Sequence, residues 1–224
     1  MKKAKEIEYQ NVILKVCESF IKNQRLPIEM IDDIRHADEE QLFAFISEHK
    51  LGPISYAVLK QEEALSDIPV IDRLNRRSYN VLKRNSNLIR EANEIKSVFI
   101  KKGISIQDYK GFSFTKIFYT DLGFRKSIDV DFAIKSNDLK AVKGLMIGLK
   151  YREAKANANI EKKNNRARYL DYPFVKDNPN GPKFLAEFHI APAHKALYVP
   201  VDFDEWNFSD DKVFSAVDQA FFVI

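Results

Sequence analysis

Two aspartates separated by one residue, Asp129 and Asp131, lie inside the apolar run 128–134. Residues i and i+2 of a β-strand project to the same face, so this spacing places the two carboxylates side by side, with the apolar neighbours directed towards a core. Carboxylates this close repel each other unless a cation lies between them. Oxygen ligands suit Mg²⁺, which binds one or two carboxylates together with substrate phosphates. The pattern predicts metal-assisted phosphoryl or nucleotidyl transfer. The alternative is a solvent-facing edge strand that carries two aspartates without a metal.

Residues that suit phosphate binding precede the two aspartates. An extended run over 104–109 leads to Lys110 and Gly111, and a helix-like segment follows over 112–119. A glycine at a strand-to-helix turn lets phosphate approach the backbone N–H groups of a helix N-terminus. We expect Ser113 to add a hydroxyl and Arg125 to clamp phosphate oxygens with two N–H groups.

This stretch resembles the uncharacterised nucleotidyltransferase family of the DNA polymerase beta-like superfamily. The family motif runs Lys-Gly, a helix ending in Tyr, a turn with Gly and an apolar residue, Arg, a short spacer, and Asp-apolar-Asp. The chain supplies this order as Lys110, Gly111, Tyr119, Gly123, Phe124, Arg125, Asp129 and Asp131. Weaker similarity covers 137–151, 38–60 and 187–189. The sequence departs from the pattern at Gln107 and Asp108 in the preceding strand, and at Lys150, where the family has Gly.

The resemblance implies a third carboxylate on a later strand. The run Phe184–Ile190 alternates so that Glu187 and His189 share one face, opposite an apolar face formed by Phe184, Ala186, Phe188 and Ile190. An acid at the centre of such a strand is costly unless it is paired or bound to a metal. Glu187 is therefore expected to complete the metal site or to act as general base. His189 is expected to orient Glu187, to contact substrate, or to serve only as a structural hydrogen-bond partner.

Composition limits the class of protein. The 224 residues are 45% hydrophobic, which is enough for a core, and no apolar run approaches the about 18 residues of a membrane span. The basic N-terminus leads into an amphipathic helix and not into an apolar signal segment. The single cysteine, Cys17, excludes an internal disulfide and a Cys-based zinc site. A cytoplasmic location is the default expectation.

The patterns predict an α+β fold in which a helical N-terminal region over 1–102 is followed by a polymerase beta-like nucleotidyltransferase core over 103–224. This core has a small mixed sheet flanked by helices. Helices are expected over 5–23, 26–35, 38–48, 53–61, 69–102 and 139–149, and strands over 104–109, 128–134, 151–156, 168–175 and 184–190. A polar, basic loop is expected over 157–168, a mostly irregular segment over 191–208 and a final helix over 210–224. Because that helix ends abruptly at Ile224, the chain is expected to be a truncated form of a longer protein.

The long pattern over 69–102 has a strongly basic polar side. It fits a solvated face, a surface that attracts polyanions, or a source of one cation near a triphosphate. The net charge of +4 agrees with weak nucleic-acid binding, although no motif of a known nucleic-acid reader is present.

The function expected from these observations is metal-dependent transfer of an NMP from an NTP, ATP by default, with release of pyrophosphate. The cofactor is Mg²⁺ or Mn²⁺. The acceptor is open among a small molecule, a protein and an RNA, and no membrane partner is expected. One alternative is a non-catalytic nucleotidyltransferase-like module that binds a nucleotide, an RNA or a protein. The other is a glycosyltransferase that uses Asp-x-Asp with a metal, a class that would want a longer α/β nucleotide-binding region upstream.

Overall fold

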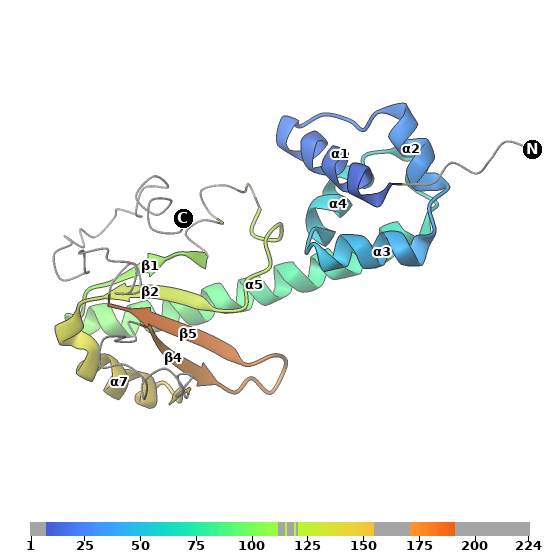
Figure 1. Cartoon of the computed structure of the whole chain (residues 1–224). Helices are drawn as coiled ribbons and strands as arrows, with labels where there is room; N and C mark the ends of the chain where they lie inside the picture. Colours follow the sequence, from blue (N-terminus) through green and yellow to red (C-terminus); the bar gives the residue numbers. More distant parts are fainter. Residues whose placement is uncertain (1–7, 112–114, 116–118, 120, 155–170, 191–224) are drawn as a thin grey trace, which may run out of the picture. The chain divides into compact units, whose positions relative to one another are not determined.

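The computed structural model describes residues 8–111, 115, 119, 121–154 and 171–190 (Figure 1). By its internal contacts the chain divides into two units. The first contains the residues up to Asn85 together with Leu122–Lys126, and the second contains the sheet. The division falls inside helix α5 (Pro69–Lys101). The boundary expected at residues 102 and 103 lies just past the end of the same helix and stays a prediction.

The first unit is helical, as the sequence predicts. Its elements are α1 (Tyr9–Lys22), α2 (Ile28–Arg35), α3 (Glu39–Glu48), α4 (Gly52–Leu59), the short 3-10 helix η1 (Glu63–Leu65) and the first half of α5. The side chain of Asp38 accepts a hydrogen bond of 2.9 Å from the backbone N–H of Gln41, which caps α3. Cys17 is half-buried, and this burial raises the pKa of its thiol.

Helix α5 begins at Pro69 and ends before Gly103, whose φ of 73° favours glycine. Its apolar stripe is buried at Leu74, Val81, Leu88, Ala92, Ile95 and Phe99, whereas Leu82 is 40% exposed. Part of its basic side is paired: Arg73 binds Glu40 at 2.6 Å in the first unit, and Lys96 binds Asp108 at 2.9 Å in the second. The ion pair between Lys96 and Asp108 explains how the strand tolerates Asp108 at a position where the resemblance implies an apolar residue.

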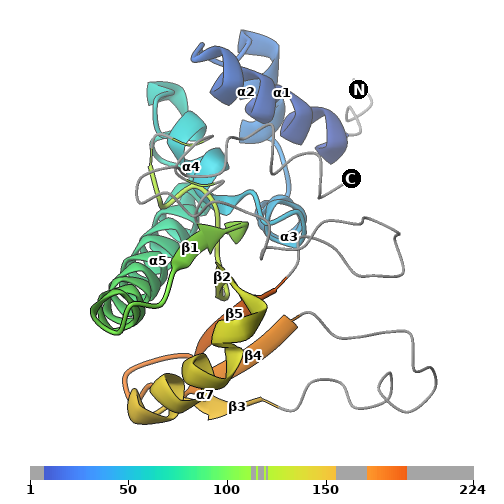
Figure 2. The same cartoon turned by 90° about the vertical axis from the view of Figure 1, so that its left-hand side faces the viewer.

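The second unit is built on a five-stranded mixed sheet in the order β1-β2-β5-β4-β3 (Figure 2). The strands are β1 (Ile106–Tyr109), β2 (Val130–Ile134), β3 (Arg152–Glu153), β4 (Asp171–Lys176) and β5 (Phe184–His189). β2 and β5 pair in parallel, and the other neighbours are antiparallel. Helix α7 (Leu139–Gly148) follows β2. The predicted α+β class is confirmed.

One face of this sheet carries the core. Phe132 of β2 and Phe188 of β5 are fully buried, and they form a cluster with Phe99 of α5, Phe174 of β4 and Met146 of α7. Both helices therefore cover the same face, and they leave the opposite face of β1, β2 and β5 to other side chains.

A buried polar network closes the edge of this core. Glu91 of α5 accepts hydrogen bonds from the hydroxyl of Tyr151 at 3.0 Å and from Lys176 of β4 at 2.8 Å. Burial, reinforced by the charge of Glu91, raises the pKa of Tyr151 well above its usual range. The hydroxyl therefore stays protonated and keeps its role as a donor.

Some predicted elements differ or fall outside the described residues. The residues Ser136–Asp138 form the 3-10 helix η2, and no side-chain hydrogen bond from Asp138 caps α7. The expected loop over 157–168, the segment 191–208 and the helix over 210–224 lie outside the described residues, as do most of 112–119. Within the described part of the chain, no helix combines the length and the hydropathy needed to cross a membrane.

The buried side chain of Asn85 anchors the turn that leads towards β2. Asn85 is fully buried, and its amide nitrogen donates hydrogen bonds to the backbone carbonyls of Leu122 and, at 2.7 Å, of Arg125. One side chain on α5 thus fixes a segment about forty residues away in the chain.

We predict that Asn85→Ala lowers the free energy of unfolding by about 1–3 kcal/mol, because the two carbonyls lose their donor. Urea unfolding followed by far-UV circular dichroism measures the change. Asn80→Ala, at an exposed position of the same helix, is the matched control. Equal losses for the two variants would show that Asn85 does not anchor the turn.

Candidate metal and nucleotide site

The parallel pairing of β2 with β5 places two carboxylates next to each other. Asp131 and Glu187 are direct partners in the register of the two strands. Their strand neighbours Phe132 and Phe188 are also partners, and they lie in the core on the opposite face. Alternation along each strand therefore puts both acids on the face opposite the one that α5 and α7 cover. The side chain of Asp131 is 9% exposed and that of Glu187 is 29% exposed.

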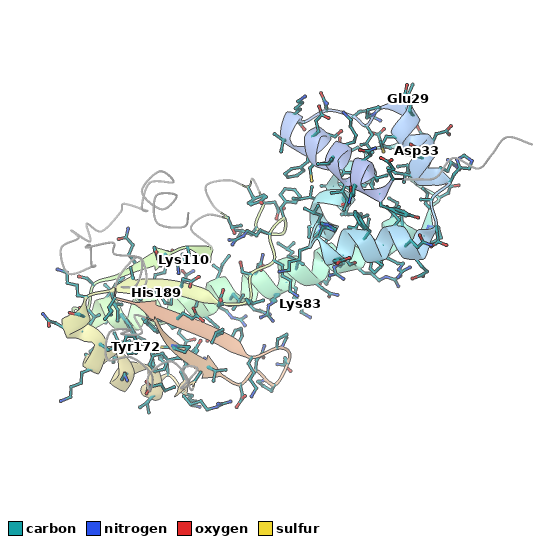
Figure 3. All side chains as sticks on the ribbon, in the orientation of Figure 1. Glu29, Asp33, Lys83, Lys110, Tyr172 and His189 are labelled. Atoms are coloured by element: carbon teal, nitrogen blue, oxygen red, sulfur yellow. The ribbon has the colours of Figure 1, made fainter. Side chains whose placement is uncertain are left out.

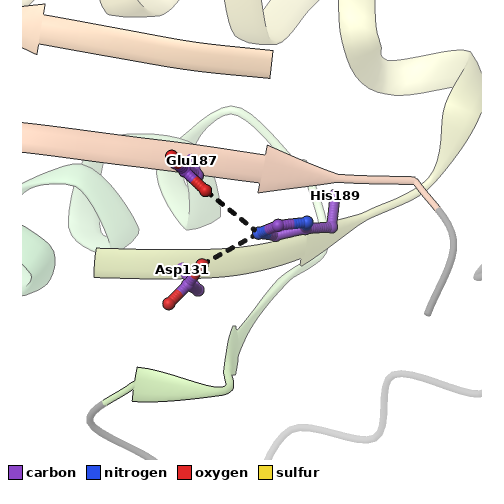
Figure 4. Close-up of side chains that lie close together, drawn as sticks. All are labelled: Asp131, Glu187 and His189. Atoms are coloured by element: carbon purple, nitrogen blue, oxygen red, sulfur yellow. Dashed lines mark hydrogen bonds and ion pairs between the residues drawn. The ribbon is translucent and has the colours of Figure 1, made fainter. Parts of the chain in front are cut away.

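His189 joins this pair from the end of β5 (Figure 4). Its Nε2 atom lies 2.9 Å from Oδ1 of Asp131 and 4.0 Å from Oε2 of Glu187. The register partner of His189 on β2 is Ala133, whose small side chain leaves room for the imidazole. On the side of β1, the ring of Tyr109 meets the imidazole edge-on at a centroid distance of 5.2 Å.

These three side chains offer a ligand set for a cation. Single ligand atoms of Asp131, Glu187 and His189 all lie within 4.8 Å of one another. In the described residues, His189 is the one ion-pair partner of Asp131, so no lysine or arginine neutralises this carboxylate. Two adjacent carboxylates fit a divalent metal ion, since oxygen ligands suit Mg²⁺ and Mn²⁺.

The backbone at Gly111 comes close to the same carboxylate. Gly111 has a φ of 30°, and a Cβ atom placed there would lie 3.0 Å from Oδ2 of Asp131. The preceding Lys110 also has a positive φ, of 48°. The hydroxyl of the buried Thr115 donates to the carbonyl of Gly111 at 3.3 Å. The Lys-Gly turn is thus held against the face that carries Asp131, and any larger residue at Gly111 would crowd this carboxylate.

The other predicted residues are placed differently. Asp129 lies just before the start of β2, is half-buried, and is not a member of the three-residue cluster. Arg125 is exposed and belongs to the first unit, where Asn85 holds its carbonyl. Ser113 lies outside the described residues. The roles of these three residues stay predictions, as do the metal roles of Asp131 and Glu187. Figure 3 shows where Lys110 and His189 lie in the sheet unit.

Sequence reasoning missed Tyr109 and Thr115. Tyr109 ends β1 as the register partner of Asp131, and its ring packs on His189. Its position directly before Lys110 was the available signal, because an antiparallel β1–β2 pair brings the end of one strand to the start of the next. Thr115 lies one helical turn after Gly111, a spacing at which a hydroxyl reaches back to a carbonyl.

A small mixed sheet that carries adjacent acids beside a Lys-Gly turn is the arrangement that the resemblance to nucleotidyltransferases implies. The family model of uncharacterised nucleotidyltransferases matches residues 35–215. This match covers most of the 224 residues, and the chain therefore belongs to that family. No curated protein matches the chain.

We predict that Gly111→Ala weakens Mn²⁺ binding by about 10-fold or more, because the added methyl displaces the Asp131 carboxylate. Titration of free Mn²⁺ by electron paramagnetic resonance measures the change. Gly103→Ala is the matched control, since Gly103 also has a positive φ but no atom lies within 4 Å of the added methyl. If the two variants bound Mn²⁺ equally well, Gly111 would not shape the site.

Proposed function

We propose that the protein transfers an NMP from an NTP, with ATP as the default, to an acceptor and releases pyrophosphate. The observation that carries this proposal is the pairing of Asp131 with Glu187 on adjacent parallel strands in a chain of the nucleotidyltransferase family. The absence of a lysine or arginine partner for Asp131 within the described residues supports a cation as the missing counter-charge.

The reaction assigned to this site is in-line attack of an acceptor oxygen or nitrogen on the α-phosphorus of the NTP. A bond forms between the acceptor and phosphorus, and the bond from phosphorus to the bridging oxygen of the pyrophosphate breaks. Asp129, Asp131 and Glu187 are proposed to hold Mg²⁺ or Mn²⁺. The ion neutralises phosphate charge when bound. Glu187, the more exposed of the two paired acids, is alternatively proposed to accept the acceptor's proton.

The triphosphate is assigned to the Lys-Gly turn. The backbone at Gly111 is close to Asp131, so phosphate oxygens held there would lie beside the metal ligands. Lys110, Ser113 and Arg125 are proposed to supply the remaining donors. The acceptor is proposed to be a small molecule, a protein or an RNA, and the proposed location is the cytoplasm.

A heat-unfolding scan with NTPs, with and without Mg²⁺, tests the proposal. We expect a rise in the unfolding midpoint that needs both Mg²⁺ and a triphosphate, because a ligand that binds only the native state stabilises it. The double variant Asp129→Asn/Asp131→Asn should lose this rise. Asp138→Asn, which removes a carboxylate from η2 outside the cluster, should keep it. No rise with any NTP in the unmodified chain would contradict nucleotide binding.

A second candidate function is a non-catalytic module that binds RNA. Arg76, Lys83 and Arg90 follow one side of α5 at seven-residue spacing and are exposed. Among the described residues none of the three has an ion-pair partner. The glycosyltransferase alternative lacks its expected upstream α/β region, since the described residues 8–101 contain helices and no strand.

Salt-dependent fluorescence anisotropy with a labelled RNA oligonucleotide tests this second candidate. Replacing Arg76, Lys83 and Arg90 by Gln should weaken binding and reduce the slope of log K against log salt by about 2, at about 0.7 per phosphate contact. The control replaces three exposed lysines elsewhere, Lys50, Lys102 and Lys140, for the same change in charge. RNA binding that persists in Asp129→Asn/Asp131→Asn without an NTP-dependent stabilisation would favour the module over the enzyme.

A further inference from the structure

His189 makes an asymmetric contact with the two acids beside it. Nε2 lies at hydrogen-bonding distance, 2.9 Å, from Oδ1 of Asp131, whereas its 4.0 Å separation from Glu187 is too long for a hydrogen bond. We propose that His189 is a positioning residue that donates its Nε2 proton to Asp131 and so presents this carboxylate to the metal. The inference rests on the metal site of the proposed function and changes the expected partner of His189 from Glu187 to Asp131.

The imidazole has little freedom to leave this position. His189 is 1% exposed and continues β5, where its backbone pairs with β2 on one side and β4 on the other. The ring of Tyr109, itself 2% exposed, packs against it at an interplanar angle of 64°. A side chain packed on this scale is confined to one rotamer, so the direction of its Nε2 atom is set by the sheet.

The two oxygens of Asp131 are distinguished by their neighbours. Oδ1 accepts the hydrogen bond from His189, and Oδ2 lies on the side of Gly111, where a Cβ atom would be only 3.0 Å away. Oδ2 makes no hydrogen bond with His189, so we assign the cation to this oxygen. It lies beside the turn to which the triphosphate is assigned, so an ion held there would be close to the phosphate charge.

A fixed hydrogen bond to a ligating carboxylate strengthens metal binding by orienting the ligand in advance. Loss of such an outer contact costs about 10–100-fold in metal affinity. A direct ligand would leave a different signature. Imidazole nitrogen favours transition metals over Mg²⁺, so removing a nitrogen ligand would weaken Mn²⁺ much more than Mg²⁺. Removing a positioning donor would weaken both ions by a similar factor, because it would disturb Asp131 as a ligand for either ion.

The test compares two amide replacements of similar polarity. In His189→Gln the amide nitrogen reaches about as far as Nε2 and retains a donor, whereas the shorter side chain of His189→Asn does not reach Asp131. Mn²⁺ affinity is measured on the full chain by electron paramagnetic resonance, and Mg²⁺ affinity by competition, both without nucleotide. His36→Gln, an exposed histidine of the first unit, is the control.

We expect His189→Asn to weaken Mn²⁺ and Mg²⁺ equally, by about 10–100-fold, and His189→Gln to restore most of that loss. A selective loss of Mn²⁺ would make His189 a ligand and overturn the inference. Equal affinities for the unmodified chain and both variants would also overturn it. If either variant failed to fold, the other would be compared with the unmodified chain, with Gln expected to bind both ions and Asn to bind neither well. Because no nucleotide is present, the expected pattern could hold even if NTP binding failed, so the two proposals can fail separately.

Discussion

The site depends on the parallel pairing of β2 with β5. In this register, Phe132 opposes Phe188 on the core face, and Asp131 opposes Glu187 on the other. Repulsion between the two adjacent carboxylates opposes this pairing of the strands, but packing of the aromatic side chains on the core face favours it. Phe188 contacts the rings of Phe99, Phe132 and Phe174 at centroid distances of 5.4–5.6 Å. Burial of one such side chain contributes about 1.5–3 kcal/mol, and a well-oriented ring pair adds about 0.5–1.5 kcal/mol. The core can therefore hold like charges together.

The Lys-Gly turn adds a second constraint, which is steric. Its backbone passes so close to Asp131 that position 111 has no room for a side chain. The hydroxyl of Thr115 donates a hydrogen bond to the carbonyl of Gly111. The carboxylate is thus confined between backbone on one side and the imidazole of His189 on the other. The loss of conformational entropy that comes with this confinement occurs once, during folding. The same loss therefore does not recur each time a ligand binds.

Much of the fold follows from local patterns in the sequence. Alternation predicted β2 and β5 and the faces of Phe132 and Glu187, and the 3.6-residue period predicted α5 almost to the residue. The contacts that form the candidate site could not be predicted from local patterns, because strand register is set by packing between distant segments. Nothing local indicates that Asp131 opposes Glu187 or that His189 bonds to Asp131. The contact of Asn85 with the turn before β2 could not be predicted either, since it joins residues far apart in the chain.

Two acids on neighbouring strands differ in the partners that balance their charge. Asp108 of β1 lies on the core side of the sheet, where its register partner is Phe132, and Lys96 of α5 neutralises it at 2.9 Å. Asp131 of β2 lies on the other face, and in the described part of the chain its one ion-pair partner is an imidazole that also lies near a second carboxylate. A sheet that can recruit a lysine for one acid leaves the other without a permanent cation. Burying a carboxylate that has no lysine or arginine partner costs free energy, and the divalent ion proposed for this site would recover it.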